Sequence, residues 1–258
     1  MRTPRAIFWD VDGTIVETER DGHRVAFNLA FEALGLTWRW DEARYGELLR
    51  ITGGRERLLH DMQTRPDAPR DASRKEALAR ELHARKNELY AALVADVGIP
   101  LRGGVLQLMD ECGARGVHMA ITTTTSRANL DALLRKHLGA DWNAHFAAIV
   151  CGEDVAHKKP DPDVFHRALQ ELAVDPRQTV AIEDSPSGVV AARGAHCPVV
   201  VTQSIYFAAE PMPGAIAVGP GLHTRAGWRP APRERSDAKC IGLEDLTDWL
   251  MPAPHFAK

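Results

Sequence analysis

The sequence lacks the cysteine patterns of disulfide-rich and zinc-binding proteins. Its four cysteines are scattered through 258 residues with no CxxC pair and no zinc-type spacing, at Cys112, Cys151, Cys197 and Cys240. Cysteines in such a pattern are most often buried, reduced and apolar in behaviour. Because disulfides are rare where thiols stay reduced, we expect a cytoplasmic protein, or one of the plastid stroma if the source is a photosynthetic eukaryote.

The sequence also lacks an excess of charge of either sign and any long apolar run. The 32 lysines and arginines nearly balance the 35 aspartates and glutamates, for a net charge of −3. The whole molecule therefore has no strong attraction for nucleic acid or an anionic membrane. With no stretch of about eighteen apolar residues, we expect neither a membrane span nor a signal peptide. The expected partner is a small molecule, and we expect a monomer.

Short apolar runs, each bounded by turn-forming or polar residues, recur along the chain. They cover residues 5–9, 117–121, 147–151, 179–182, 198–201 and 215–218. Between them lie stretches with helical patterns, at about 104–115, 127–138, 162–172 and 186–193. Strands that alternate with helices indicate βαβ units. The sequence therefore predicts an α/β fold with a Rossmann-like, three-layer core, in which helices cover both faces of a parallel sheet.

One long segment, from about Glu19 to Asp96, has no convincing strand. Its clearest helix begins near the capping-box pattern Ser73-Arg74-Lys75-Glu76 and carries leucines at helical spacing, at Leu78, Leu82, Leu89 and Leu93. We therefore predict a helical cap of residues 19–96, inserted after the first strand of a core made of residues 1–18 and 97–258. The stretch 219–239 is rich in Gly, Pro and Arg and is expected to be irregular.

Two carboxylates stand two residues apart directly after the first apolar run, at Asp10 and Asp12. In an extended chain such residues point to one side, about 6 to 7 Å apart. Two acids so placed repel each other and raise each other's pKa unless a cation lies between them. The spacing therefore predicts a hard divalent metal, Mg²⁺. The alternative is a plain strand-end turn, to which Asp and Gly13 supply only turn chemistry.

Further polar groups follow three later apolar runs, where ligands bind in open α/β sheets. The hydroxyl cluster with Thr123 and Thr124 can offer O–H and N–H groups to a phosphate. Lys159 follows the next run, and Glu183 and Asp184 follow the one after, where they could complete a metal site. Each group alone also fits a helix cap or a solvated loop. Together, after successive strands, they favour a phosphate site.

In this order the motifs Asp10-x-Asp12-Gly13-Thr14, Thr123, Lys159 and Glu183-Asp184 resemble those of the haloacid dehalogenase superfamily of phosphotransferases. The resemblance implies a parallel sheet with a helical cap, and a reaction in which Asp10 attacks phosphorus to form an aspartyl phosphate. It implies that Asp12 protonates the leaving oxygen and then activates water. The dehalogenase branch lacks this second acid, so dehalogenation is not expected.

The same resemblance implies the remaining roles. Asp10 and Asp184 would bind Mg²⁺ through carboxylate oxygens and Asp12 through its backbone carbonyl, with Glu183 as a further candidate ligand. Lys159 and the Thr123 hydroxyl would orient and neutralise the phosphoryl oxygens.

The residues after the first strand, 17–28, and the run Thr52-Gly53-Gly54-Arg55-Glu56-Arg57 look like those of CbbY-type sugar bisphosphate phosphatases. That branch serves carbon fixation by dephosphorylating xylulose-1,5-bisphosphate, and it is related to β-phosphoglucomutase and phosphoglycolate phosphatase. A turn at Gly54 would expose N–H groups, and Arg55 beside it could hold a second phosphate by two parallel hydrogen bonds. Further candidates for substrate binding are Glu17, His23 and Lys86.

Three functions therefore stay open. The leading hypothesis is a Mg²⁺-dependent phosphatase of a small sugar bisphosphate. The second is a phosphosugar mutase, because His23 also matches the cap histidine of the β-phosphoglucomutase branch. The third is a phosphosugar-binding regulator without catalysis, although the intact set of Asp10, Asp12, Lys159 and Asp184 argues against it.

Overall fold

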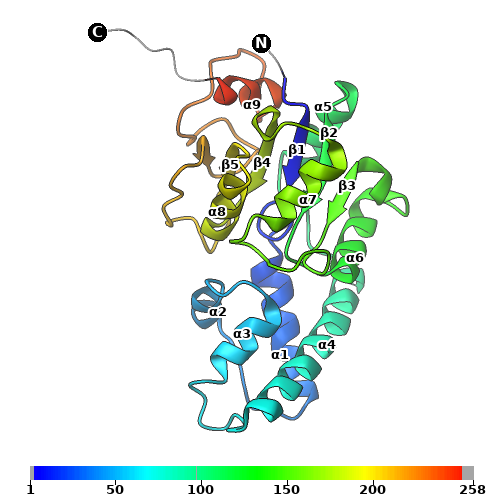
Figure 1. Cartoon of the computed structure of the whole chain (residues 1–258), viewed down its shortest axis with the longest axis vertical. Helices are drawn as coiled ribbons and strands as arrows, with labels where there is room; N and C mark the ends of the chain where they lie inside the picture. Colours follow the sequence, from blue (N-terminus) through cyan, green and yellow to red (C-terminus); the bar gives the residue numbers. More distant parts are fainter. Residues whose placement is uncertain (1–2, 97, 252–258) are drawn as a thin grey trace.

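The computed structural model describes residues 3–96 and 98–251, and its centre is a six-stranded sheet with the strand order β3-β2-β1-β4-β5-β6 (Figure 1). Each neighbouring pair is parallel. The strands are β1 (Ala6–Trp9), β2 (His118–Thr122), β3 (Ala148–Val150), β4 (Thr179–Glu183), β5 (Val199–Thr202) and β6 (Ala217–Gly219). The predicted α/β fold is confirmed.

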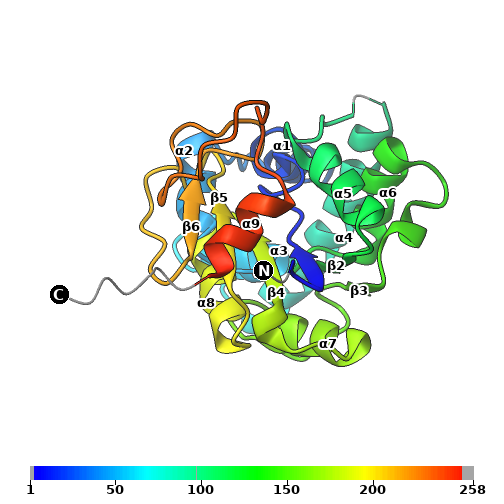
Figure 2. The same ribbon diagram turned by 90° about the horizontal axis from the view of Figure 1, so that it is seen from above.

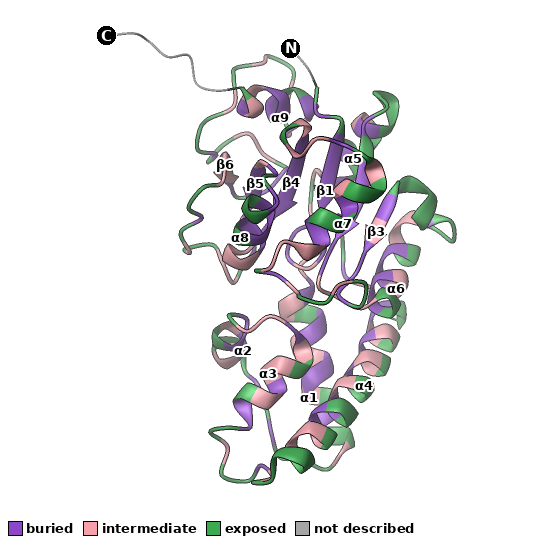
Figure 3. Cartoon of the chain, in the orientation of Figure 1, coloured by how far each residue is buried: buried purple, intermediate pink, exposed green. Residues whose placement is uncertain are grey.

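Helices cover both faces of the sheet and form the outer two of three layers, as Figure 2 shows from above. On one face Ile7 and Trp9 of β1 pack with α5 (Val105–Ala114), α6 (Arg127–Leu138) and α9 (Leu243–Leu250). On the other face Ala6 and Phe8 pack with α7 (Asp163–Leu172) and α8 (Pro186–Gly194). Because both faces are covered, the strands are almost wholly buried (Figure 3). Two short 3₁₀ turns, Trp142–His145 and Pro176–Gln178, complete the core.

The register places the ends of three central strands side by side. Trp9 of β1 lies level with Ile121 of β2 and Ile182 of β4. Parallel strands point their carboxyl ends to one edge, so the residues that follow these three positions meet there. This edge faces the helical lobe in Figure 1.

The helical lobe consists of a π-helical turn and four α-helices. They are η1 (Glu19–His23), α1 (Arg24–Ala33), α2 (Glu42–Leu48), α3 (Gly54–Asp61) and α4 (Ala72–Asp96). The lobe has its own apolar cluster, centred on aromatic side chains such as Phe27, Trp40 and Tyr45. It corresponds to the segment expected to be a cap. Three of the limits given for the two domains, residues 1, 97 and 258, lie outside the described residues.

The buried face of α4 differs from the leucine pattern. The buried residues of this helix are Ala79, Leu82, Lys86, Tyr90 and Val94, so only one of the four leucines is buried. These positions are three or four residues apart, as one helix face requires. A lysine therefore occupies the middle of the face that α4 turns toward the rest of the protein.

Two expectations about composition can be compared with the structure. All four cysteines are free, and three of them are buried. Within residues 3–96 and 98–251, none of the helices is both long enough and apolar enough to cross a bilayer.

The Arg-rich stretch 219–239 is irregular but firmly held to α9. The carboxylate of Asp245 pairs with Arg225 at 2.5 Å and with Arg235 at 2.6 Å. Beside this pairing, the rings of Trp228 and Trp249 stack with centroids 4.9 Å apart. The segment therefore closes the core on the side away from the cap.

We expect Asp245→Ala to lower the free energy of unfolding by about 3 kcal/mol, because the partly buried Arg225 loses its carboxylate partner and Arg235 keeps only Glu244 and Asp248. Chemical denaturation of the purified variant measures this loss. The exposed Asp237 lies in the same region, and Asp237→Ala should change stability by no more than about 0.5 kcal/mol. Equal effects of the two substitutions would contradict the role given to Asp245.

Candidate active site

Lys159 lies at the centre of the strand-end edge and joins three strands. Its Nζ donates hydrogen bonds to Asp10 Oδ1 at 2.7 Å, to Glu183 Oε1 at 2.6 Å and to the carbonyl oxygen of Thr122 at 2.8 Å. An ammonium group has three donors, and all three are used. The residues predicted from successive strand ends are thus in contact, although their roles stay predictions.

The charges of this cluster are strongly coupled. Burial alone would lower the pKa of Lys159, but the attraction of Asp10 and Glu183 raises it above its usual value. Burial raises the pKa of Asp10, which Lys159 only partly offsets. Burial and then repulsion from Asp10 raise the pKa of Asp184. One buried cation therefore faces three buried carboxyl groups, so the cluster has room for further positive charge.

The carboxyl groups fit a Mg²⁺ ion. Asp10, Glu183 and Asp184 each offer an oxygen, and these oxygens lie within 4.8 Å of one another. Hard carboxylate oxygens are the ligands that Mg²⁺ prefers. Gly13 leaves space for one of them, since a Cβ at this position would lie 2.1 Å from Asp184 Oδ2.

Glu183 is the member of this set whose metal role is least supported by geometry. Its Oε1 already accepts a hydrogen bond from Lys159. Its Oε2 is buried without a hydrogen-bond partner among the described residues. It points at Gly188 of α8, where a Cβ would lie only 1.8 Å from it. The contact with Lys159 indicates that Glu183 chiefly orients the lysine.

Asp12 is held from the cap side of the site. Its Oδ1 accepts hydrogen bonds from His23 Nε2, at 3.0 Å, and from the hydroxyl of Thr18. Burial would raise the pKa of Asp12. The charge and hydrogen bond of His23 and the hydrogen bond of Thr18 outweigh burial and lower this pKa to about 2. The His23 ring stacks on Tyr90 of α4 with centroids 4.2 Å apart. His23 therefore contacts the second acid directly.

Two cavities with shared lining residues lie between the sheet edge and the helical lobe. The smaller, of about 60 Å³, contains Asp10, Lys159 and Asp184. The larger, of about 250 Å³, extends between α3 and α4 on one side and the start of α6 on the other. Asp12 and Thr124 line both cavities. We call the smaller one the reaction pocket and the larger one the seam cavity.

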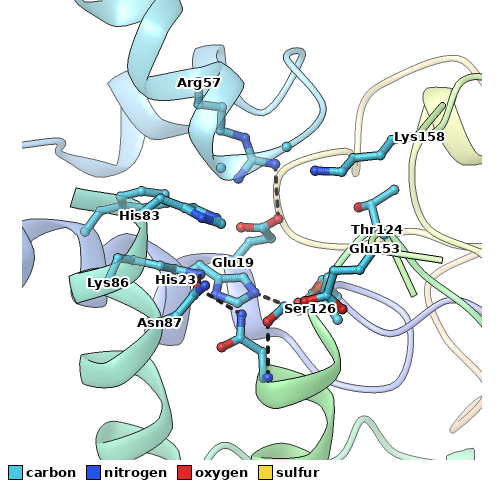
Figure 4. Close-up of a pocket in the computed structure, with 17 residues that line it drawn as sticks. Glu19, His23, Arg57, His83, Lys86, Asn87, Thr124, Ser126, Glu153 and Lys158 are labelled. Atoms are coloured by element: carbon cyan, nitrogen blue, oxygen red, sulfur yellow. Dashed lines mark hydrogen bonds and ion pairs between the residues drawn. The ribbon is translucent and has the colours of Figure 1, made fainter. Parts of the chain in front are cut away.

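The seam cavity is rich in cationic groups. Arg57 and Lys86 enter it from the helical lobe and Lys158 from the core, with His83 beside them (Figure 4). Burial, followed by the charges of Lys86 and Lys158, lowers the pKa of His83 to about 4. The imidazole is therefore neutral at neutral pH. Arg57, Lys86 and Lys158 therefore offer positive charge to an anion from both lobes, and the carboxylates of Asp12, Glu19 and Glu153 line the same cavity.

Lys86 is the most deeply buried of these cations. Its ammonium group lies 5.3 Å from the ring centre of Phe27 and 5.0 Å from that of Tyr90, so it is held mainly by aromatic faces. Burial lowers its pKa to about 8, although Asp12 and Glu19 favour the charged form.

Four of the residues predicted to bind substrate are brought together in one cavity. Gly54, His23, Lys86 and Thr124 all line the seam cavity. Thr123 is instead buried just behind it, where its Oγ1 accepts a hydrogen bond from the backbone N–H of Thr125 at 3.2 Å.

Arg55 is a correction, because the structure does not bring it into either cavity. Its Nη1 donates to Glu76 Oε1 at 2.7 Å, at the outer side of α4. The arginine that lines both cavities is Arg57, two residues later. Two residues correspond to about 200° around a helix axis, so the two side chains leave α3 in nearly opposite directions. The sequence predicts a phosphate-binding turn with Arg55 beside it, whereas the structure places Arg57 in the cavities.

Glu17 is a second correction. Its carboxylate lies 3.5 Å from the guanidinium group of Arg102 and lines neither cavity. Glu19 lines both cavities instead. Glu19 accepts hydrogen bonds from the hydroxyl of Tyr45 and, at 3.4 Å, from Arg57. The π-helical turn that begins at Glu19 directs its side chain inward, and no sequence pattern signalled that turn.

Comparison with known proteins gives one family match and several relatives. A family model of haloacid dehalogenase-like hydrolases matches residues 4–196. Protein CbbY of Cupriavidus necator is 45% identical over 246 residues, which cover 95% of this chain and 96% of that protein. A CBBY-like protein of Arabidopsis thaliana is 40% identical, over 83% of this chain and 68% of its own length.

Solved structures give the same picture. A CbbY mutant from Rhodobacter sphaeroides, in complex with xylulose-1,5-bisphosphate, is similar with a TM-score of 0.76 and 40% identity, over 82% of this chain and 92% of that chain. A β-phosphoglucomutase from Clostridium difficile has a TM-score of 0.64 over 83% of this chain and 90% of that chain, but only 20% identity. The second likeness concerns the fold alone.

Saturating Mg²⁺ is expected to raise the melting temperature by about 5 °C or more at neutral pH, because an ion held by the carboxyl cluster would stabilise the native state. Differential scanning fluorimetry with and without the ion measures the shift. The shift should shrink as the pH falls, since protons compete for carboxylates whose pKa is raised.

Asp184→Asn should remove most of this shift. The matched control is Asp163→Asn, in a second group of possible ligands formed by His157, Asp161 and Asp163. Loss of the shift in the control, with retention in Asp184→Asn, would place the ion elsewhere.

Proposed function

The chain belongs to the haloacid dehalogenase-like hydrolases and is an enzyme of the phosphatase class, and we propose that it is a Mg²⁺-dependent phosphatase of a small sugar bisphosphate. Xylulose-1,5-bisphosphate is the substrate we propose. One observation carries the proposal: a reaction pocket lined by Asp10 and Asp12 shares lining residues with a seam cavity that has three cationic groups. Such a pair of sites fits a substrate with one phosphate to cleave and another to hold.

In the reaction pocket Asp10 would attack phosphorus and form an aspartyl phosphate. Asp12 would give a proton to the leaving sugar oxygen and later accept one from the attacking water. The low pKa of Asp12 keeps it ionised, as the second step requires. The negative phosphates of a bound substrate would raise that pKa and favour the protonated form needed first.

The remaining groups of the pocket orient and neutralise charge. Lys159 fixes the Asp10 carboxylate through one of its three hydrogen bonds. Mg²⁺, held by the carboxylates of Asp10 and Asp184 and by the Asp12 carbonyl, would neutralise the phosphoryl oxygens. Thr124, which lines both cavities, lies where it can donate to the same phosphate.

The seam cavity would hold the distal phosphate. Arg57 and Lys86 from the cap and Lys158 from the core can pair with one dianion, which would draw the two lobes together. Glu19 and His83 offer a charged acceptor and a neutral ring to sugar hydroxyls. Such closure excludes bulk water from the aspartyl phosphate. With xylulose-1,5-bisphosphate, the reaction would remove a by-product of carbon fixation.

A phosphate-release screen tests the function. Purified enzyme is incubated with xylulose-1,5-bisphosphate, ribulose-1,5-bisphosphate and sugar monophosphates, with Mg²⁺ and with a chelator. We expect Mg²⁺-dependent phosphate release that favours the bisphosphates.

The same screen addresses the alternatives. The contact between His23 and Asp12 also fits a mutase, in which the phosphoryl group returns to a second hydroxyl. Isomer formation from a sugar monophosphate without phosphate release would favour the mutase. Binding of sugar phosphates with no turnover of any ester would favour a regulator.

We expect Arg57→Ala to raise KM for the bisphosphate by about ten- to a hundredfold, because a charged hydrogen-bonding group is lost. KM for a monophosphate should change little, since it lacks the distal group. Steady-state kinetics on both substrates measures the difference. Arg55→Ala is the matched control and should keep the bisphosphate preference. A larger increase in KM for Arg55→Ala than for Arg57→Ala would indicate that Arg55 binds the distal phosphate.

The pH dependence should report Lys86, whose charged form is present below about pH 8. The value of kcat/KM for the bisphosphate should fall about tenfold per pH unit above that value, because a neutral lysine no longer pairs with the phosphate. The Lys86→Met variant should be slower throughout and lack this decline. If kcat/KM of the variant declined in the same way above about pH 8, the decline would come from another titrating group.

A further inference from the structure

A loop of the core touches the cap on the side of the seam opposite to α4. It follows β5 and carries Tyr206, Phe207 and Glu210. The ring of Tyr206 meets that of Tyr45 in α2 edge-on, with centroids 6.0 Å apart and planes at 62°. Phe207 packs against both the core and the cap clusters. Outside them, Glu210 pairs with Arg50 at 3.3 Å.

Gly46 makes the close approach of Tyr206 possible. A Cβ at this position would lie 3.1 Å from Tyr206 Cδ1 and 3.4 Å from Cε1. Gly46 lies inside α2, where glycine is among the poorest helix formers. A glycine inside a helix usually has a packing or functional reason. Here the reason is the space that the ring of Tyr206 occupies.

Tyr45 connects this contact to the seam cavity. Its ring faces Tyr206, and its hydroxyl donates to Glu19. The same hydroxyl accepts a hydrogen bond from Arg57 Nη1 at 3.0 Å, and the Arg57 guanidinium lies 5.5 Å from the centre of the ring. Figure 4 shows Arg57 directed at Glu19 in the cavity. Tyr45 is therefore one of the groups that hold the guanidinium group, together with Glu19 and the carbonyl oxygen of Ile51.

We propose that Tyr206 is a positioning residue for substrate specificity: its ring supports Tyr45 and thereby holds Arg57 where the distal phosphate binds. Tyr206 lines neither the reaction pocket nor the seam cavity, so it acts through the cap. Its hydroxyl is buried without a partner among the described residues. The support therefore comes from the ring and not from the hydroxyl. The inference rests on the proposed function, which places a phosphate at Arg57.

The test compares kinetics on a sugar bisphosphate and on a small monoester, p-nitrophenyl phosphate. Tyr206→Ala should raise KM for the bisphosphate about tenfold, and kcat for the monoester should stay within about twofold. Tyr206→Phe should behave like the wild type, because the ring is kept. Gly46→Ala should reproduce the selective effect in a helix that alanine favours, so that misfolding does not explain it. Ile205→Ala is the control. Ile205 is an exposed neighbour of Tyr206, and its substitution should change neither KM for the bisphosphate nor kcat for the monoester.

A double-mutant cycle that combines Tyr206→Ala with Arg57→Ala tests whether Tyr206 changes KM through Arg57. If Tyr206 acts through Arg57, Tyr206→Ala should have almost no further effect once the arginine is absent. Additive effects, equal losses on both substrates, or a damaging Tyr206→Phe would each overturn this inference and leave the proposed function intact. A wild-type enzyme without preference for bisphosphates would overturn both.

Discussion

The buried ammonium group of Lys159 is the interaction on which the site depends. It comes from the loop after β3 and reaches Asp10 after β1, the carbonyl of Thr122 in β2 and Glu183 at the end of β4. These three acceptors, one from each strand, fix the position of the ammonium group. Removal of one partner of a buried ion pair typically lowers the free energy of unfolding by about 3–5 kcal/mol. The parallel register brings those acceptors together, and the lysine then fixes the orientation of the Asp10 carboxylate. Burial raises the pKa of Asp10, Glu183 and Asp184, and the one lysine charge does not fully offset this effect, so the site suits a divalent cation that would stabilise the ionised carboxylates.

Much of the core could be predicted because its signals are local and its geometry is general. Runs such as Thr179–Ile182 are short, apolar and bounded, and parallel strands must end at one edge. That rule alone places Asp10, Lys159 and Asp184 together although they are far apart in the sequence. The observed strands differ from the predicted ones by only one or two residues at their ends.

The cap was harder to predict, because local backbone geometry decides which side chains enter the cavities. The sequence predicts Arg55 and Glu17, whereas Arg57 and Glu19 line the cavities. Arg55 and Arg57 both lie in α3, where side-chain direction changes by about 100° per residue, so a shift of two residues selects another face. The phase of α3 depends on Gly53 as its cap, with φ of 98°, and that of Glu19 depends on a π-helical turn. Neither the Gly53 cap nor the π-helical turn is marked in the sequence by a periodic pattern of apolar residues. His83, Lys158 and Tyr206 gain their positions only from tertiary contacts.

The cationic seam also bears on how the two lobes separate. Burial lowers the pKa of Lys86, Asp12 and Glu19 act against this effect, and Arg57 adds to it. A ligand with a second phosphate would bring negative charge between Arg57 and Lys86 of the cap and Lys158 of the core. A sugar that keeps its distal phosphate after hydrolysis would still neutralise the seam, whereas free inorganic phosphate could leave from the reaction pocket first. The two products would then leave in a fixed order, with inorganic phosphate first and the sugar phosphate, which contacts both lobes, second.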